Sequence, residues 1–314
     1  MIIKEKEIIS SYKKNGYTVV KNLIPYELIE DVLKIYTRLI YQKPLIYTQS
    51  THKWEEIQLD NEGLIIQSIL NPSTLKTLHP LNDCLEEIIY HKNIEKVLSI
   101  IFNEKAFKIG CWQDMFFDKS TATIPHIDSW YLDTLPKGDL LGAWIALEDI
   151  DGKGGAFVVY PKTHLRDKTS EWSQLNHKEY LSWASKLAEK NKRKELLIKK
   201  GDAVFWHPSL LHGSTDFESS NKTRKSITAH YFPNNFIRSN GRVLQMNRDF
   251  SAYINYVKEQ NFRSRSFGYA IRAQKRRRDI IKKNFFGVIN KIRSKYNDPK
   301  MLMNRKYLNK TNYE

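Results

Sequence analysis

The sequence predicts an α+β protein in which helices precede and interrupt a sandwich or small barrel of short β-strands. Three observations predict this class. Apolar residues recur at helical spacing in the N-terminal third, short β-rich runs start at Ala106, and helical spacing returns at 166–199. With 314 residues, 41% of them hydrophobic, the chain can bury one large core. We therefore expect one domain over 1–260, with its core at 106–233, followed by a separate segment at 261–314.

The N-terminal third is expected to form a strand followed by helices. A turn at 15–16 precedes the β-rich run Tyr17–Val20, and Pro25 is well placed at the start of a helix. Apolar residues then recur at helical spacing up to about Tyr41. Further helical segments are expected at 72–78, 83–90 and 93–103.

The middle of the chain is expected to form the β core. From Ala106 onward, aromatic and β-branched residues gather in short runs separated by Gly, Pro, Asp and Lys. Such runs predict a sandwich or barrel. The expected strands are 106–117, 122–128, 139–149, 154–160, 202–206 and 225–232. The interval 166–199 interrupts them as a helical insertion, where a lid or a wall of a substrate pocket would lie.

Two histidines and one aspartate are candidate metal ligands. His126 and Asp128 are two residues apart, so a strand would present both on one face, and His212 follows the run 202–206 in a short loop. Two imidazoles and a carboxylate bind ferrous iron on one face and leave its other positions open for oxygen and an organic co-substrate. His207 is a competing ligand, ranked below His212 because Gly-Ser follows the latter. His164, His177 and His230 are expected at the surface or in packing contacts.

Arg224 lies twelve residues after His212, at the start of the next expected strand. In an apolar pocket, a guanidinium can hold a carboxylate through two parallel hydrogen bonds. Beside an iron site, such an arginine would be suited to binding a dicarboxylate. The alternative is an ion pair within the fold, which is the more common role of an arginine on a strand.

Several motifs follow one another in order from Gln113 to Tyr231. They are His126-Ile127-Asp128, Trp144-Ile145-Ala146-Leu147-Glu148-Asp149, the loop from Gly155 to His164, Gly201-Asp202, His212-Gly213-Ser214 and Arg224. As a set they resemble the phytanoyl-CoA dioxygenase family of Fe(II)- and 2-oxoglutarate-dependent oxygenases. The loop ends in Lys-Thr-His where Gly-Ser-His is commoner, and Ile127 replaces a frequent Gln, but neither change removes a ligand.

The resemblance implies a fold and a set of site residues. The fold is a double-stranded β-helix, a cupin-like jelly roll, with N-terminal helices, the helical insertion and a basic helical tail. His126, Asp128 and His212 would bind Fe(II), and Arg224 with Ser214 would bind the distal carboxylate of 2-oxoglutarate. The implied pocket residues beside the co-substrate are Trp144 and Gln113.

The resemblance also implies a reaction. O2 and 2-oxoglutarate would be consumed, a small-molecule or carrier-linked metabolite hydroxylated, and succinate and CO2 released. Halogenating relatives lack the carboxylate that Asp128 supplies here, so hydroxylation is favoured. Two other classes stay open: a cupin-like metal-binding isomerase or ligand-binding module without oxygen chemistry, and a membrane- or nucleic-acid-associated protein.

The net charge of +16 is concentrated at the C-terminal end, where 261–314 holds sixteen Lys or Arg against three Asp or Glu. Within it, 276–293 predicts a helix with one apolar face and a basic remainder. Such a helix can lie on an anionic membrane surface, bind an acidic partner or nucleic acid, or pack on the domain. Nucleic acid is unlikely as a partner, because oxygenases that repair it carry a second arginine six residues after the first, where His230 stands.

Composition also predicts a compartment. The chain has two cysteines, Cys84 and Cys111, and its first residues lack the apolar core of a signal peptide. No apolar run reaches the roughly 18–20 residues of a membrane helix. We expect a cytoplasmic protein, with a membrane-peripheral location as an option through 276–293. The oligomeric state stays open.

Overall fold

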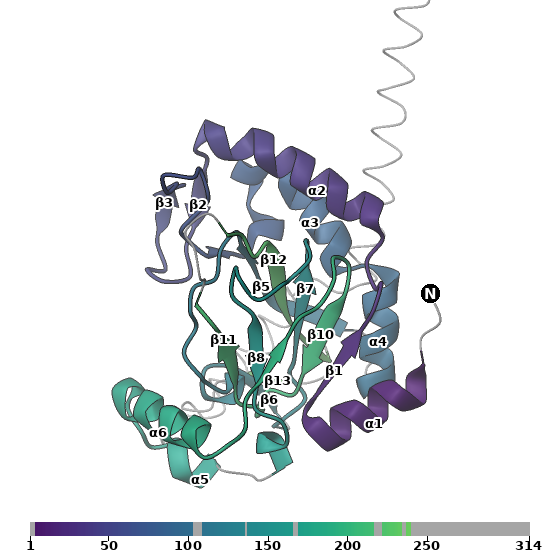
Figure 1. Cartoon of the computed structure of the whole chain (residues 1–314), viewed down its shortest axis with the longest axis vertical. Helices are drawn as coiled ribbons and strands as arrows, with labels where there is room; N and C mark the ends of the chain where they lie inside the picture. The colour runs from purple at the N-terminus through teal and green to yellow at the C-terminus, as the bar shows by residue number, and fades with distance from the viewer. Residues whose placement is uncertain are drawn as a thin grey trace, which may run out of the picture. The chain divides into compact units, whose positions relative to one another are not determined.

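The computed structural model describes residues 4–102, 109–135, 137–165, 169–216, 222–233 and 237–239 (Figure 1). The predicted basic extension 261–314, with its candidate membrane-binding helix at 276–293, lies outside the described residues and stays a prediction. Among the helices that are described, none is long and apolar enough to cross a membrane.

Of the α-helices in the described residues, four come from the N-terminal third and two from the insertion. They are α1 (Glu5–Asn15), α2 (Tyr26–Leu39), α3 (Leu81–Ile89), α4 (Lys92–Phe102), α5 (Thr169–Trp172) and α6 (His177–Glu189). The predicted helix after Pro25 is confirmed as α2. The segment 72–78 forms two short 3-10 turns, at Pro72–Thr74 and Lys76–Leu78. α1 was not predicted, because only Ile8 of this polar helix is buried, so it carries little apolar periodicity.

The described strands form two antiparallel sheets and two short pairs. The larger sheet contains, in spatial order, β1 (Tyr17–Val20), β10 (Ala203–Trp206), β7 (Leu141–Ala146), β12 (Ser226–Pro233), β5 (Ile109–Phe117) and β4 (Ile69–Leu70). The smaller sheet contains β11 (His212–Ser214), β8 (Phe157–Val159) and β9 (Lys194–Leu196). The short pairs are β2 (Leu45–Tyr47) with β3 (Trp54–Glu56), and β6 (Asp133–Leu135) with β13 (Ile237–Ser239).

The two sheets pack face to face, as expected of a jelly roll. Alternate residues of the strands point into the space between them. The shared core includes Trp144, Val204 and Trp206 from the larger sheet and Phe157 and Val159 from the smaller sheet. This arrangement confirms the predicted α+β, jelly-roll fold.

The helices α1 to α4 cover the opposite face of the larger sheet (Figure 1). Tyr231 of β12 points to that side and donates a hydrogen bond from its hydroxyl to the carbonyl of Ile89 in α3, at 2.7 Å. The ring of Tyr36 in α2 packs 5.1 Å from the ring of Phe116 in β5. Since neighbouring residues of a strand face opposite ways, Thr228 and His230 point into the interior between the sheets.

The insertion differs in part from its prediction. Its helix α6 packs on the outer face of the smaller sheet, where Tyr180, Ala184 and Val158 belong to one apolar cluster, and the insertion ends in strand β9. Residues 194–196 were expected to be helical, but pairing with β8 places them at the edge of a sheet. None of the described residues of the insertion lines the central cavity, so α6 supports the site from behind.

Candidate metal centre

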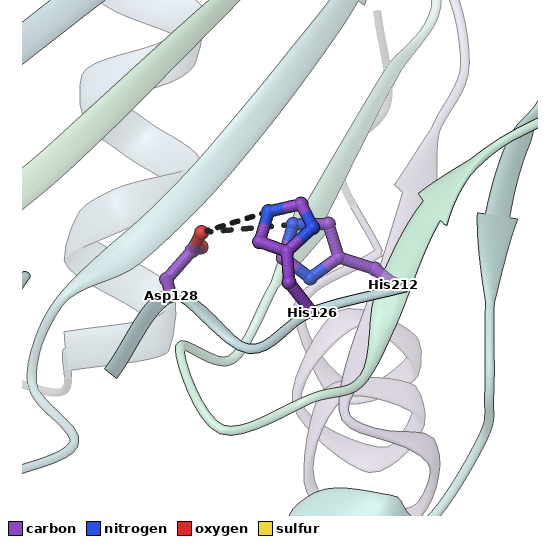
Figure 2. Close-up of side chains that lie close together, drawn as sticks. All are labelled: His126, Asp128 and His212. Carbon is purple, nitrogen blue, oxygen red and sulfur yellow. Dashed lines mark ion pairs between the residues drawn. The ribbon is translucent and has the colours of Figure 1, made fainter. Parts of the chain in front are cut away.

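The side chains of the three predicted ligands point toward one another (Figure 2). The backbones of His126 and His212 exchange two hydrogen bonds, of 2.9 and 3.0 Å, which set the two rings side by side. Asp128 begins a 3-10 turn, Asp128–Trp130, that directs its carboxylate toward them. One potential ligand atom from each residue lies within 4.8 Å of the others.

The expected strand at 122–128 is wrong in detail. His126 belongs to an isolated bridge, and the carbonyl of Asp128 accepts from the backbone N–H groups of Tyr131 and Leu132. The two side chains therefore converge through a strand-to-turn junction. His212, expected in a loop, is the first residue of β11.

Both histidines present Nε2 toward the carboxylate. Nδ1 of His126 lies 2.9 Å from the carbonyl of Ile124, and Nδ1 of His212 lies 2.9 Å from that of Leu210. A carbonyl accepts only, so Nδ1 carries the proton and the Nε2 lone pair is free for a metal. Burial lowers the pKa of His212 to about 4, so this imidazole is neutral at neutral pH.

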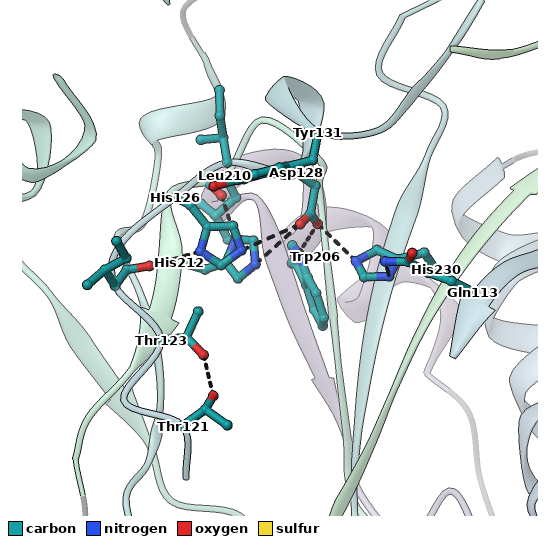
Figure 3. Close-up of polar contacts among 12 residues, drawn as sticks. Gln113, Thr121, Thr123, His126, Asp128, Tyr131, Trp206, Leu210, His212 and His230 are labelled. Carbon is teal, nitrogen blue, oxygen red and sulfur yellow. Dashed lines mark hydrogen bonds and ion pairs between the residues drawn. The ribbon is translucent and has the colours of Figure 1, made fainter. Parts of the chain in front are cut away.

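Asp128 is a buried anion held on two sides (Figure 3). Its Oδ1 faces the ligand histidines, while Oδ2 accepts from Nε1 of Trp206 at 2.8 Å and lies 3.4 Å from Nε2 of His230. Burial by itself raises the pKa of this carboxyl. The imidazoles of His212, His230 and His126 outweigh burial and hold the pKa well below its ordinary range.

Two interactions of Asp128 were not predicted from the sequence. His230, expected at the surface or in packing contacts, is buried and faces the carboxylate, and Trp206, expected only as part of the strand run 202–206, donates a hydrogen bond to it. A period-two signal was present: Arg224, Thr228 and His230 are separated by even numbers of residues and all line the same cavity.

Arg224 lies just before β12, held by a 2.8 Å bond from its backbone N–H to the carbonyl of Asp118. Its guanidinium carbon is 5.9 Å from the ring of Phe117 and 5.5 Å from the ring of Trp144. Within the described part of the chain, its buried Nε has no hydrogen-bond partner and no carboxylate pairs with it. Burial lowers the pKa to about 10, which leaves the side chain charged. A buried cation of this kind calls for an anionic ligand.

One cavity of about 540 Å³ joins the triad to Arg224. Every site residue predicted from the sequence lines it: Gln113, His126, Asp128, Trp144, His212, Ser214 and Arg224. Ser214 accepts at Oγ from the backbone N–H of Thr123, at 2.8 Å, and Nε2 of Gln113 lies 3.4 Å from Nδ1 of His230. The donor set fits a divalent metal, and the free guanidinium fits a carboxylate bound in the same cavity.

The competing candidate His207 lies elsewhere, as do His164 and His177. The rings of His207 and His164 are 5.3 Å apart, and Nδ1 of His207 accepts from the backbone N–H of Ser209. Nε2 of His177 lies 3.1 Å from the hydroxyl of Tyr131. None of these three histidines belongs to the metal-ligand cluster found among the described residues.

Gly142 leaves room for the indole that holds Asp128. It pairs with Trp206 across β7 and β10, and a methyl group at this position would overlap the indole ring. Trp206 is buried and cannot turn away without losing its bond to the carboxylate. We expect Gly142→Ala to lower the free energy of unfolding by about 1–3 kcal/mol, measured by denaturant titration. An unchanged unfolding midpoint would show that the indole has space to move.

Comparisons with known proteins agree with this geometry. A family model described as phytanoyl-CoA dioxygenase matches residues 12–226. The peroxisomal phytanoyl-CoA dioxygenase of Homo sapiens is 28% identical over 244 residues, and that of Rattus norvegicus is 32% identical over 242 residues. Each match covers 70% of this chain and 66% of the relative, so the chain spans slightly less than two thirds of their length. The relatives are named as peroxisomal, and the cytoplasmic location expected here stays a prediction.

Several solved structures have a similar fold. The epimerase SnoN, in complex with Fe3+, alpha ketoglutarate and nogalamycin RO, aligns with a TM-score of 0.58 at 15% identity, over 78% of this chain and 92% of that chain. The carbocyclase SnoK has a TM-score of 0.56 at 17% identity, over 75% and 86% of the two chains. EctD from S. alaskensis, with 2-oxoglutarate and 5-hydroxyectoine, has a TM-score of 0.53 at 13% identity, over 79% and 82%. At such identities the similarity shows the fold alone.

Proposed function

Because the chain belongs to the phytanoyl-CoA dioxygenase family, we propose that it is an Fe(II)- and 2-oxoglutarate-dependent oxygenase that hydroxylates a small-molecule or carrier-linked metabolite and releases succinate and CO2. The observation that carries the proposal is the pairing, in one cavity, of the His-Asp-His cluster with a buried arginine that lacks an anionic partner among the described residues.

The metal-ligand cluster and the arginine then have distinct roles. His126, Asp128 and His212 would hold Fe(II), with Nε2 of both imidazoles and one carboxylate oxygen as ligand atoms. Arg224, with Ser214 beside it, would hold the distal carboxylate of 2-oxoglutarate. Together the bound metal and co-substrate supply oxidation of a C–H bond by O2, coupled to conversion of 2-oxoglutarate to succinate and CO2.

The remaining walls of the cavity orient the co-substrate and exclude water. Trp144 is stacked 5.5 Å from Phe157, and the guanidinium of Arg224 lies 5.5 Å from the ring of Trp144. Phe157 in turn lies nearly parallel to His212, at 5.6 Å. These rings provide an apolar environment in which the charge of Arg224 is poorly screened, so its attraction for a carboxylate is strengthened.

The charges of the cavity walls also indicate what kind of substrate the cavity accepts. Among the described lining residues other than histidines, two are charged at neutral pH, Asp128 and Arg224, and both are assigned above. The other lining residues, histidines aside, carry no charge and include Gln49, Ser50 and Ile124. We therefore propose that the part of the substrate that reacts is uncharged. A neighbouring groove of about 530 Å³ shares Gln49 and Ser50 and offers further amides and hydroxyls for a polar extension of that molecule.

Anaerobic titration with Fe(II) and 2-oxoglutarate tests the proposal directly. We expect a visible metal-to-ligand charge-transfer band, which forms only when the co-substrate chelates the metal. In His126→Ala the band should be lost, because one of the three ligands is removed. Folded wild-type protein without a band would contradict the proposal. Succinate formation in air, screened against candidate metabolites, would then identify the substrate.

A further inference from the structure

Tyr180 of α6 binds the backbone of the residue that separates two metal ligands. Its hydroxyl accepts a hydrogen bond from the N–H of Ile127, at 2.7 Å, and donates one to the carbonyl of the same residue, at 3.0 Å. Ile127 has extended backbone angles, φ −115° and ψ 139°. In that conformation the N–H and C=O of one residue point the same way, so one hydroxyl can satisfy both.

The backbone N–H and C=O of Ile127 need such a hydrogen-bond partner. The backbone of His126 pairs with His212 on one side. Ile127 faces the opposite side, where the tyrosine hydroxyl takes the place that a neighbouring strand would occupy. Ile127 is buried, and a buried N–H or C=O without a partner costs about 1–3 kcal/mol each. The side chain from the insertion thus stabilises the extended backbone between the ligands.

The tyrosine is itself held rigidly. Tyr180 is 0% exposed, and its ring is stacked on that of Trp130, at 4.4 Å and 14°. Trp130 belongs to the 3-10 turn that begins at Asp128, so one aromatic ring supports the residues on both sides of the carboxylate ligand. Ile127 and Ala184 of α6 belong to the same apolar cluster. A fixed ring with a fixed hydroxyl can determine where His126 and Asp128 point.

We propose that Tyr180 is a positioning residue of the metal centre, acting through the Ile127 backbone to set the separation and direction of His126 and Asp128. The inference deepens the proposed function, since it concerns the same metal ligands, but it requires only that the triad binds a divalent metal. It differs from a purely structural role because loss of the hydroxyl should alter metal binding more than it alters stability.

The test compares Tyr180→Phe with Tyr231→Phe. Both tyrosines are 0% exposed, and the hydroxyl of Tyr231 donates to the carbonyl of Ile89, on the helix side of the larger sheet. Each variant keeps the ring and loses a buried hydrogen bond, so both melting temperatures should fall. Only Tyr180→Phe should weaken binding of Fe(II), by ~10–100-fold, as loss of an outer partner of metal ligands does. It should also change the visible absorption spectrum of the Co(II)-substituted protein.

Two results would overturn the inference: wild-type metal affinity and Co(II) spectrum in Tyr180→Phe, or an equal change in Tyr231→Phe. If Tyr180→Phe does not fold, hydrogen exchange of the Ile127 amide in the wild-type protein tests the inference instead. Fast exchange would show that the tyrosine does not hold this N–H and would overturn the inference. The readouts need neither 2-oxoglutarate nor O2. A wild-type protein that binds Co(II) but gives no charge-transfer band with Fe(II) and 2-oxoglutarate would refute the proposed function alone.

Discussion

Replacement of Arg224 by methionine is expected to weaken binding of 2-oxoglutarate by at least about 30-fold while leaving Fe(II) binding nearly unchanged. The guanidinium is buried between aromatic rings and has no carboxylate partner among the described residues, so a bound dicarboxylate would be its counter-ion. Loss of one member of a buried, hydrogen-bonded charge pair costs roughly 2–5 kcal/mol. The lower limit of this range corresponds to a loss of affinity of about 30-fold. The amplitude of the charge-transfer band against co-substrate concentration gives the affinity.

Two further variants show whether the guanidinium of Arg224 itself causes the loss of 2-oxoglutarate affinity. Arg224→Lys keeps the charge but loses the planar pair of donors, so we expect an intermediate affinity. Arg193→Met removes an arginine that is 60% exposed and paired with Glu195, and it should leave the band unchanged. Unaltered 2-oxoglutarate binding in Arg224→Met would move the carboxylate site away from this arginine.

The second large effect is expected for Asp128→Asn. Asparagine keeps the shape of the side chain and can still accept from Trp206, but it removes the negative charge from the metal site. Loss of an outer partner of a metal ligand already costs ~10–100-fold in affinity, so loss of an anionic ligand should exceed 100-fold. We expect the charge-transfer band and 2-oxoglutarate-dependent succinate formation to disappear together.

Asp202→Asn is the matched control. Asp202 is also a buried carboxylate, but it accepts from the backbone N–H groups of Asn22 and Lys199 in the turn before β10 and does not line the cavity. This variant should lose some stability and retain Fe(II) binding. If Asp128→Asn binds Fe(II) as the wild type does, the carboxylate is not a ligand, and the metal must be held by the histidines with another group.

Parts of the fold with strong local periodicity could be predicted. Helix α2 carries an apolar stripe that buries Ile29, Val32 and Tyr36, and β12 is a continuous run of buried residues. The elements that were missed or misjudged lack such a signal. The strand β9 is three residues long with two of them exposed, so only its pairing with β8 defines it.

The residues of the candidate site, too, could be predicted from the sequence only in part. The metal ligands and Arg224 could be proposed from residue type, order and spacing, because a donor set for ferrous iron is chemically restricted. Trp206, His230 and Tyr180 could not, since each acts on a residue 53 or more positions away in the chain. Which distant side chain meets Asp128 or Ile127 is determined by sheet order and by the packing of α6.

By itself, the sequence determined the chemistry available: two imidazoles, a carboxylate and an arginine in the order of a known family, on a chain able to form a jelly roll. Only the tertiary structure decided that Nδ1 of each ligand histidine faces a carbonyl, that Asp128 is held ionised, and that Arg224 is buried without an anionic partner among the described residues. The reason is physical. Protonation state, burial and hydrogen bonding depend on groups brought together by folding, which local sequence patterns do not report.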